Sequence, residues 1–271
     1  MEALFLDGRQ GPLFCVYHPA AVQRREKIGL VYLPPFAEEM NRSRRMVALQ
    51  ARRLAALGVD VLLLDLFGTG DSAGDFGDAR WETWREDAKA AMDWLGARCA
   101  GRVGLWGLRL GALLAAEVAA EAPSGLARLL LWQPVLSGER HLTQFLRLRV
   151  AASMGKGSGK ETARDLRARL SQGEALEIAG YELAPALAEA IAGLQLAALL
   201  ARLKGLRPDL MEVSAGEDPA PAPATQQLLG ELERQGLPHT ARAVCGEPFW
   251  SIQEITLAPR LLDATDALFR P

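Results

Sequence analysis

WGLRLG, at residues 106–111, separates two apolar stretches of different kinds and decides the fold. The preceding run, residues 103–106, is short and favours a buried strand, and the following alanine-rich run favours a helix that continues to about Glu121. Gly107 and Gly111 stand four positions apart, a spacing that permits a sharp turn from a strand into a helix. The middle residue of this turn is Arg109, which we expect to project above the carboxyl end of the strand.

Strands and helices alternate along most of the chain. Two short strands open it, and from residue 28 onward a helix follows each predicted strand, an order that indicates a parallel sheet with right-handed crossovers. The predicted strands are residues 3–6, 13–17, 28–33, 59–64, 103–106, 127–132, 210–214 and 240–244. Besides the alanine-rich helix, the predicted helices are residues 46–57, 81–98, 225–235 and 256–269.

The alternation stops between residues 137 and 205. This segment is rich in Ala, Leu, Arg and Glu and predicts helices without a convincing strand, and its MGKGSGK sequence at residues 154–160 predicts a mobile joint. Helices inserted before the last two strands are typical of the α/β-hydrolase fold. We therefore predict a doubly wound, mostly parallel sheet with helices on both faces, built from residues 1–136 and 206–271, and a helical cap insertion at residues 137–205.

Composition and charge exclude several classes of protein. The 271 residues are 49% hydrophobic and 24% charged, as in a single globular domain, and a net charge of −2 argues against nucleic-acid binding. Three scattered cysteines (Cys15, Cys99 and Cys245) form neither a disulfide framework nor a zinc site, so we expect no metal. The glycine-rich turn after residue 64 lacks a Walker lysine and the G-x-G-x-x-G spacing, and we expect no cofactor.

The sequence also predicts where the protein resides. Its amino terminus lacks the basic start and long apolar stretch of a signal peptide. The most apolar later stretch, residues 190–203, is shorter than a bilayer span and favours a cap or core helix. We expect a cytoplasmic protein that does not span a membrane.

The turn at residues 107–111 has the place of the G-x-S-x-G motif of a nucleophilic serine, but Arg109 stands where the serine would be. A guanidinium group stays protonated in proteins, so it can neither attack a carbonyl group nor act as a base. It also places a positive charge against the positive end of a helix dipole. We therefore expect a carboxylate or a bound anion beside Arg109, because an unpaired buried charge is very costly.

The other two triad positions are also altered. Asp218, in the turn after the next-to-last strand, matches the position of the triad acid. The segment after the last strand, which should carry the histidine, contains Glu247 instead, and we expect no histidine near Arg109. Glu247 could serve as a lone general base. Phe249 and Trp250 are expected to pack around the altered site.

The loop after the strand at residues 28–33 has the place of an oxyanion loop. Its residues Phe36, Ala37, Glu38 and Glu39, together with Arg109 and Leu110, are the predicted ligand-binding residues. Arg109 has two interpretations. It is either a structural plug paired with a carboxylate, or a clamp for an anionic ligand such as a carboxylate or phosphate. The expected carboxylate partner is Glu38 or Glu39, then Asp218 or Glu247.

Four segments together resemble one family. Arg109 within GLRLGA, the loop PPFAEEMNRSRRM, the turn DLFGTGDSAG and the ending GEPFW resemble the second type of exosortase A system-associated hydrolase. The similarity extends over most of the chain and is weakest in the cap. The resemblance implies an α/β-hydrolase fold and an association with the exosortase/PEP-CTERM system and its exopolysaccharide genes.

Three functions agree with these residues. The first is a protein with a degenerate triad that binds a small acidic or acylated molecule, or a protein of the exosortase/exopolysaccharide system, without catalysis or with altered chemistry. The second is an active ester or thioester hydrolase or acyltransferase, with Arg109 as oxyanion stabiliser and a carboxylate as base. The third is an assembly partner whose pocket is filled.

Overall fold

A computed structural model describes residues 1–99, 102–122, 126–155, 161–203, 205–216 and 218–270. Its main feature is an eight-stranded sheet with the order β1-β2-β4-β3-β5-β6-β9-β10. Strands β1 and β2 are antiparallel to their neighbours, and all the other neighbouring strands are parallel. The strands are β1 (Glu2–Gly8), β2 (Gly11–His18), β3 (Ile28–Leu33), β4 (Val59–Leu64), β5 (Val103–Leu108), β6 (Leu129–Trp132), β9 (Pro208–Ser214) and β10 (Thr240–Cys245).

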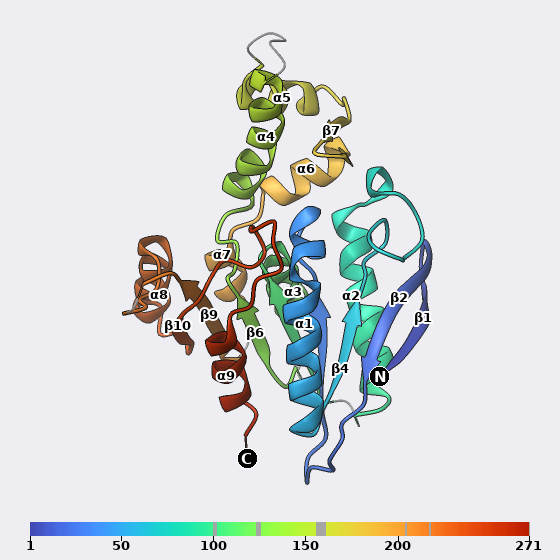
Figure 1. The fold of residues 1–271 in the computed structure, drawn as a ribbon, viewed down its shortest axis with the longest axis vertical. Helices are drawn as coiled ribbons and strands as arrows, with labels where there is room; N and C mark the ends of the chain where they lie inside the picture. The colour runs from blue at the N-terminus through green and yellow to red at the C-terminus, as the bar shows by residue number, and fades with distance from the viewer. Residues whose placement is uncertain (100–101, 123–125, 156–160, 204, 217, 271) are drawn as a thin grey trace.

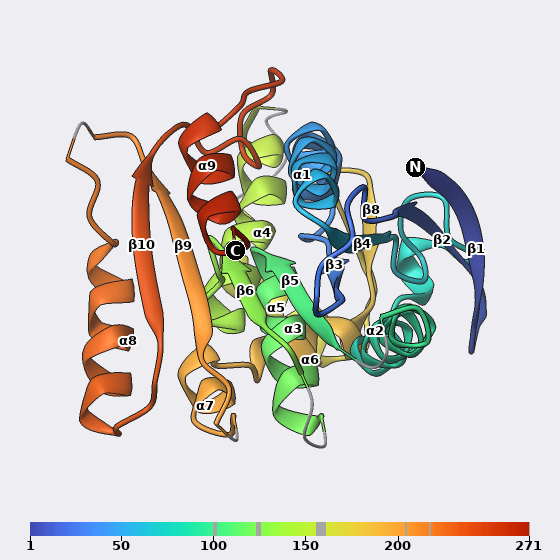
Figure 2. The ribbon, with the colours of Figure 1, turned by 90° about the horizontal axis from the view of Figure 1, so that it is seen from below.

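Helices cover both faces of this sheet (Figures 1 and 2). The helices α1 (Glu38–Ala56) and α9 (Pro259–Ala267) pack on one face and share a hydrophobic cluster with it. The helices α2 (Trp81–Gly96), α3 (Leu110–Glu121) and α8 (Pro223–Arg234) contribute to the cluster on the other face. Because the central strands are buried on both sides, they are continuous apolar runs, as in VYL of β3 and LLLW of β6. The predicted doubly wound, mostly parallel sheet is confirmed.

The predicted cap is present between β6 and β9. It contains α4 (Gly138–Gly155), α5 (Ala163–Ser171) and α6 (Pro185–Ala192), which lie above the carboxyl ends of the parallel strands (Figure 1). The exact boundaries at residues 136 and 206 stay a prediction. The expected mobile joint lies for the most part outside the described residues. Among the described helices, none is both long and apolar enough to cross a membrane.

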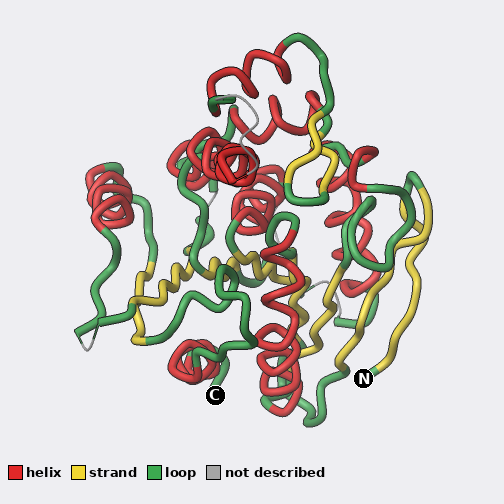
Figure 3. Tube along the Cα trace, turned by 45° about the horizontal axis from the view of Figure 1, so that its top comes forward, coloured by secondary structure: helices red, strands yellow, loops and turns green. Residues whose placement is uncertain are grey.

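The structure corrects two expectations about the cap. The cap holds a hairpin of β7 (Leu176–Ile178) and β8 (Tyr181–Leu183), drawn in yellow beside the cap helices in Figure 3, where no strand was expected. Three-residue strands are too short to show a period of two, and the turn depends on positive φ angles at Ala179 and Gly180. The stretch 190–203 is not one helix: α6 ends at Ala192, and α7 (Leu196–Leu200) packs against α3.

Helix α1 begins at Glu38, eight residues before its predicted start. Its first two turns carry the polar residues Asn41–Arg45, which hide the apolar period that reveals the rest of the helix. The preceding residue, Ala37, has φ 50° and ψ −128°, so the chain turns sharply from the loop after β3 into the helix. This early start places Glu38 and Glu39 in the first turn of α1.

Candidate functional site

The turn between β5 and α3 has the geometry of a nucleophile elbow. Arg109 has φ 55° and ψ −117°, a strained conformation for a residue with a Cβ atom. A Cβ atom on Gly107 would lie 2.4 Å from the carbonyl oxygen of Gly111, and one on Gly111 would lie 2.2 Å from that of Leu33. Both positions therefore require glycine, and the elbow is built although its middle residue is an arginine.

Arg109 forms an ion pair with Glu39. The Nε atom donates to Oε1 and Oε2 of Glu39 at 3.2 and 3.3 Å, and Nη2 donates to Oε1 at 3.2 Å. The side chains are 17% and 22% exposed, respectively. Burial raises the pKa of Glu39 above its ordinary value, although the charge of Arg109 opposes this shift. The prediction that a carboxylate lies within about 4 Å of Arg109 is confirmed, and the partner is Glu39.

The neighbouring Glu38 has different partners. Its Oε1 atom lies 3.8 Å from Nε of Arg42, and its Oε2 atom accepts a hydrogen bond from the hydroxyl of Tyr181 at 3.0 Å. Since Tyr181 belongs to β8, Glu38 links the first turn of α1 to the cap. The two consecutive glutamates thus have separate roles, one at the elbow and one at the edge of the cap.

Asp218 and Glu247 are both exposed. Among the ion pairs of the described residues, neither is a partner of Arg109. The structure therefore brings together Arg109 and Glu39 but does not join the two predicted triad-position carboxylates to them. A role for Asp218 or Glu247 stays a prediction.

One aromatic side chain of the segment after β10 packs against the guanidinium group, and a second supports it. The Cζ atom of Arg109 lies 5.5 Å from the ring centroid of Trp250, within the range of a cation–π interaction. Trp250 packs edge-to-face on Phe249 at 5.0 Å, and Phe249 packs on Trp132 of β6. The expectation that Phe249 and Trp250 pack around the site is confirmed.

A pocket of about 590 Å³ lies between these residues and the cap. Its walls come from the loop after β3, from α1, from α4 and from the segment around Trp250. Of the predicted ligand-binding residues, Phe36, Ala37, Glu38 and Glu39 line this pocket. Leu110 is 2% exposed and borders a smaller void behind Ala37 instead. The other lining residues are Arg42, His141, Gln144, Phe145, Leu148, Ala179, Trp250 and Ser251.

His141 is a titratable residue of this pocket that the sequence analysis did not place there. Helix α4 places its ring 5.7 Å from that of Phe36, where it is 7% exposed, and its Nε2 atom is buried without a hydrogen-bond partner in the described structure. Burial, and secondarily the charge of Arg109, lowers the pKa of His141 to about 3. The expectation of no histidine near Arg109 is wrong, because cap folding brings a distant helix over the elbow.

The same arrangement limits the chemistry. A histidine with a pKa of about 3 is neutral at pH 7 and is a weak general base. No serine, threonine or cysteine occupies the elbow. In the described part of the chain, no group of three or more His, Cys, Asp or Glu side chains could hold a metal ion.

The mostly parallel sheet, the elbow after β5 and the cap after β6 define a protein of the α/β-hydrolase fold. The chain belongs to the X-Pro dipeptidyl-peptidase (S15) family, because the profile of that family matches residues 14–204, more than half of the chain. No curated protein matches the sequence.

Solved structures share the fold at low sequence identity. Est1E from Butyrivibrio proteoclasticus, solved with ferulic acid bound, superimposes with a TM-score of 0.72 at 14% identity over 98% of this chain and 97% of that chain. The α/β hydrolase GrgF from Penicillium sp. sh18 gives a TM-score of 0.65 at 16% identity over 99% and 97%. The proline iminopeptidase of Mycobacterium smegmatis gives 0.61 at 15% identity over 99% and 97%.

Proposed function

We propose that this protein uses the hydrolase fold to bind a small acylated or acidic molecule and does not carry out serine-type hydrolysis. The observation that carries the proposal is the Arg109–Glu39 ion pair, which occupies the elbow where a nucleophile would stand. A guanidinium group held by three hydrogen-bond contacts can recognise a polar group, but it has no lone pair with which to form an acyl-enzyme.

The pocket supports an acylated ligand in particular. Phe36, Phe145, Leu148 and Trp250 offer apolar surface for an acyl group. Arg109 is not one of the lining residues of this pocket. The polar end of the ligand would meet its partner Glu39, which the ion pair with Arg109 holds in place, and the unpartnered Nε2 atom of His141. A ligand carboxylate could also share a proton with Glu39, because the raised pKa of Glu39 makes its protonated form more accessible.

The family resemblance supplies the biological setting of the proposal. The motifs around Arg109 and the ending GEPFW support a role beside the exosortase/PEP-CTERM system and its exopolysaccharide genes, with a protein of that system as a further candidate partner. A cytoplasmic location belongs to the same proposal. It is supported by the three cysteines, which are all described and all free thiols.

A second candidate function is acyl transfer or hydrolysis with an unconventional site. It is favoured by Glu39, a pocket-lining carboxylate whose raised pKa suits a general base, next to a guanidinium group that could stabilise an oxyanion. In that reaction Glu39 would take a proton from a water molecule, the water oxygen would attack the acyl carbon, and the alcohol or thiol would leave with a proton.

Turnover separates these two candidates. We expect no hydrolysis of p-nitrophenyl acetate or p-nitrophenyl butyrate above background. Arg109→Ser should not create it, because burial, the larger cause of the low pKa of His141, remains and leaves a weak base. Steady-state absorbance assays on wild type, Arg109→Ser and Glu39→Gln test this. A saturable rate in wild type that is lost in Glu39→Gln would replace the first candidate by the second.

Binding tests the first candidate directly. Native mass spectrometry of the purified protein should identify a bound acylated or acidic molecule. Arg109→Met should reduce its affinity by at least about tenfold, because Glu39 in the pocket wall then loses the charge-assisted hydrogen bonds that orient it. Arg140→Met is the matched control, because Arg140 is an exposed arginine of the cap outside the pocket lining. Equal affinity of wild type and Arg109→Met would contradict the proposal.

A further inference from the structure

A second pocket lies at the opposite end of the sheet from the cap. Its volume is about 700 Å³. It is formed at Ile28, where β3 begins, at Leu57, just after the end of α1, and at Leu268, just after the end of α9. The cap lies over the carboxyl ends of the parallel strands (Figure 1). This pocket lies at their amino ends and shares no lining residue with the pocket below the cap, so the two are separate.

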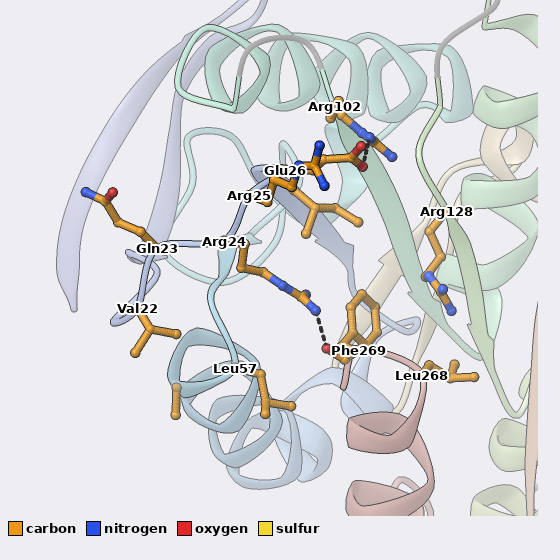
Figure 4. Close-up of a pocket in the computed structure, with 12 residues that line it drawn as sticks. Val22, Gln23, Arg24, Arg25, Glu26, Leu57, Arg102, Arg128, Leu268 and Phe269 are labelled. Atoms are coloured by element: carbon orange, nitrogen blue, oxygen red, sulfur yellow. Dashed lines mark hydrogen bonds and ion pairs between the residues drawn. The ribbon is translucent and has the colours of Figure 1, made fainter. Parts of the chain in front are cut away.

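The lining of this pocket is strongly basic. The lining residues that the structure describes include four arginines, Arg24, Arg25, Arg102 and Arg128, and one carboxylate, Glu26. They come from three segments: the loop between β2 and β3, the start of β5 and the start of β6 (Figure 4). Four guanidinium groups around one concave surface create a positive potential that attracts anions.

The structural contacts of these arginines use only part of their donors. Nη2 of Arg24 donates to the carbonyl oxygen of Phe269 at 2.6 Å, and Nη1 of Arg128 donates to Asp209 at 2.8 Å. Arg102 pairs with Glu26, and both side chains are more than half exposed. A guanidinium group has five N–H donors, so each of these arginines keeps donors for a ligand.

Arg25 is the least engaged of the four. It is exposed, and the hydrogen bonds and ion pairs found among the described residues do not include it. The charge of Arg25 thus has no evident structural use, in contrast to those of Arg24 and Arg128. Figure 4 shows Arg25 beside Glu26 and Arg102 at one side of the pocket, with Arg24 and Arg128 nearer Phe269.

The rest of the lining is apolar. Ile28, Ala56, Leu57 and Leu268 provide aliphatic surface between the arginines. A volume of about 700 Å³ is within the roughly 300–1,000 Å³ range of small-molecule sites. The pocket therefore fits an anionic group with an apolar part attached to it.

We propose that this pocket is a second ligand site, which binds a phosphate or pyrophosphate group carried on a partly apolar molecule. Arginine forks match phosphate oxygens with paired hydrogen bonds, and several arginines around one group suit a multiply charged anion better than a single carboxylate. The phosphate could belong to a free small molecule or to a lipid headgroup, and both would present the same oxygens to Arg24, Arg25 and Arg102.

Calorimetric titration with inorganic pyrophosphate at low salt tests the site, with Arg25→Ala/Arg102→Ala as the variant. Both side chains are exposed, so the double variant should fold, which circular dichroism checks. We expect wild type to bind, the double variant to bind at least about tenfold more weakly, and added salt to weaken the wild-type complex. Arg242→Ala, an exposed arginine on the edge strand β10, is the matched control and should bind as wild type does.

Vesicle sedimentation separates the two sources of phosphate. Binding to phosphatidylcholine vesicles that contain phosphatidic acid, lost in the double variant, would assign the phosphate to a lipid headgroup. Pyrophosphate binding without vesicle binding would assign it to a free small molecule. Failure of both probes to bind wild type, or equal binding by wild type and the double variant, would overturn the proposal.

Discussion

Replacing Glu39 by alanine should destabilise the protein more than replacing Arg109 by methionine. Glu39→Ala leaves the guanidinium group without its carboxylate at the amino terminus of α3, where the helix dipole is also unfavourable to a positive charge. Breaking a fully buried pair costs roughly 3–5 kcal/mol, and since these side chains are about one fifth exposed, we expect about 2–4 kcal/mol for Glu39→Ala. Urea denaturation monitored by tryptophan fluorescence measures the free energy of unfolding.

Arg109→Met leaves an unpaired carboxyl group, whereas Glu39→Ala leaves an unpaired guanidinium group. Glu39 can take up a proton when the guanidinium group is gone, because burial already raises its pKa. The methionine keeps an unbranched aliphatic stem against Trp250, and the strained backbone at φ 55° is the same for both side chains. We therefore expect a loss of about 1 kcal/mol, below the cost of leaving the guanidinium group unpaired, because the remaining acid can become neutral.

Glu38→Ala is the matched control for this comparison. Glu38 is the adjacent glutamate in the same helical turn, but its side chain is 49% exposed and its pair with Arg42 is long. Its loss should cost less than about 1 kcal/mol, as for surface ion pairs. A cost for Arg109→Met equal to or above that of Glu39→Ala would show that the arginine is needed for packing and not for charge balance.

The sequence could predict those parts of the fold that depend on local pattern. The apolar runs of β3, β4 and β6 predict strands, because burial on both faces requires apolar residues. The glycines of the elbow predict the turn, because the close approach of the backbone there leaves no room for a Cβ atom. The hairpin β7–β8 could not be predicted in this way, since strands of three residues are too short to show an alternating pattern.

The sequence could predict which loop lies beside Arg109, but not which glutamate of that loop pairs with it. The sequence places both Glu38 and Glu39 near Arg109, but the choice between them depends on where α1 begins, because consecutive helical residues point about 100° apart. His141 could not be placed at all, since its position depends on how α4 docks over the core. Contacts between distant segments determine these two features of the site, and no local pattern in the sequence records them.

The pH dependence of stability should reveal the buried histidine. Burial lowers the pKa of His141 to about 3 from an ordinary value of 6.5, so between these values the unfolded chain binds more protons than the folded one. The free energy of unfolding is therefore not reduced by His141 above about pH 6.5, where this side chain is neutral in both states. Below that pH the unfolded state is stabilised by protonation of His141, so the free energy of unfolding decreases as pH falls toward 3. Between pH 7 and pH 5 this one residue should remove about 2 kcal/mol from the free energy of unfolding.

Other buried groups also titrate in this range. Burial raises the pKa of Asp87 to about 6, against the hydrogen bond that it accepts from the backbone N–H of Phe67. The effect of Asp87 on stability is opposite to that of His141, because a raised carboxyl pKa makes the folded protein more stable as pH falls through 6. Burial lowers the pKa of His18, which acts in the same direction as His141. Only a comparison of variants can therefore isolate His141.

His141→Leu should remove the part of the pH dependence of the free energy of unfolding that His141 causes. Leucine has a similar volume, suits the neighbouring rings of Phe36 and Phe145, and does not titrate. The free energy of unfolding of the variant should fall by about 2 kcal/mol less than that of wild type between pH 7 and pH 5, as urea denaturation at both values would measure. His239→Leu, at a partly exposed histidine before β10 and outside this pocket, is the matched histidine-to-leucine control. Parallel pH profiles for wild type and His141→Leu would mean that His141 is not held neutral beside Arg109, and that the cap does not close over the elbow in solution as it does in this structure.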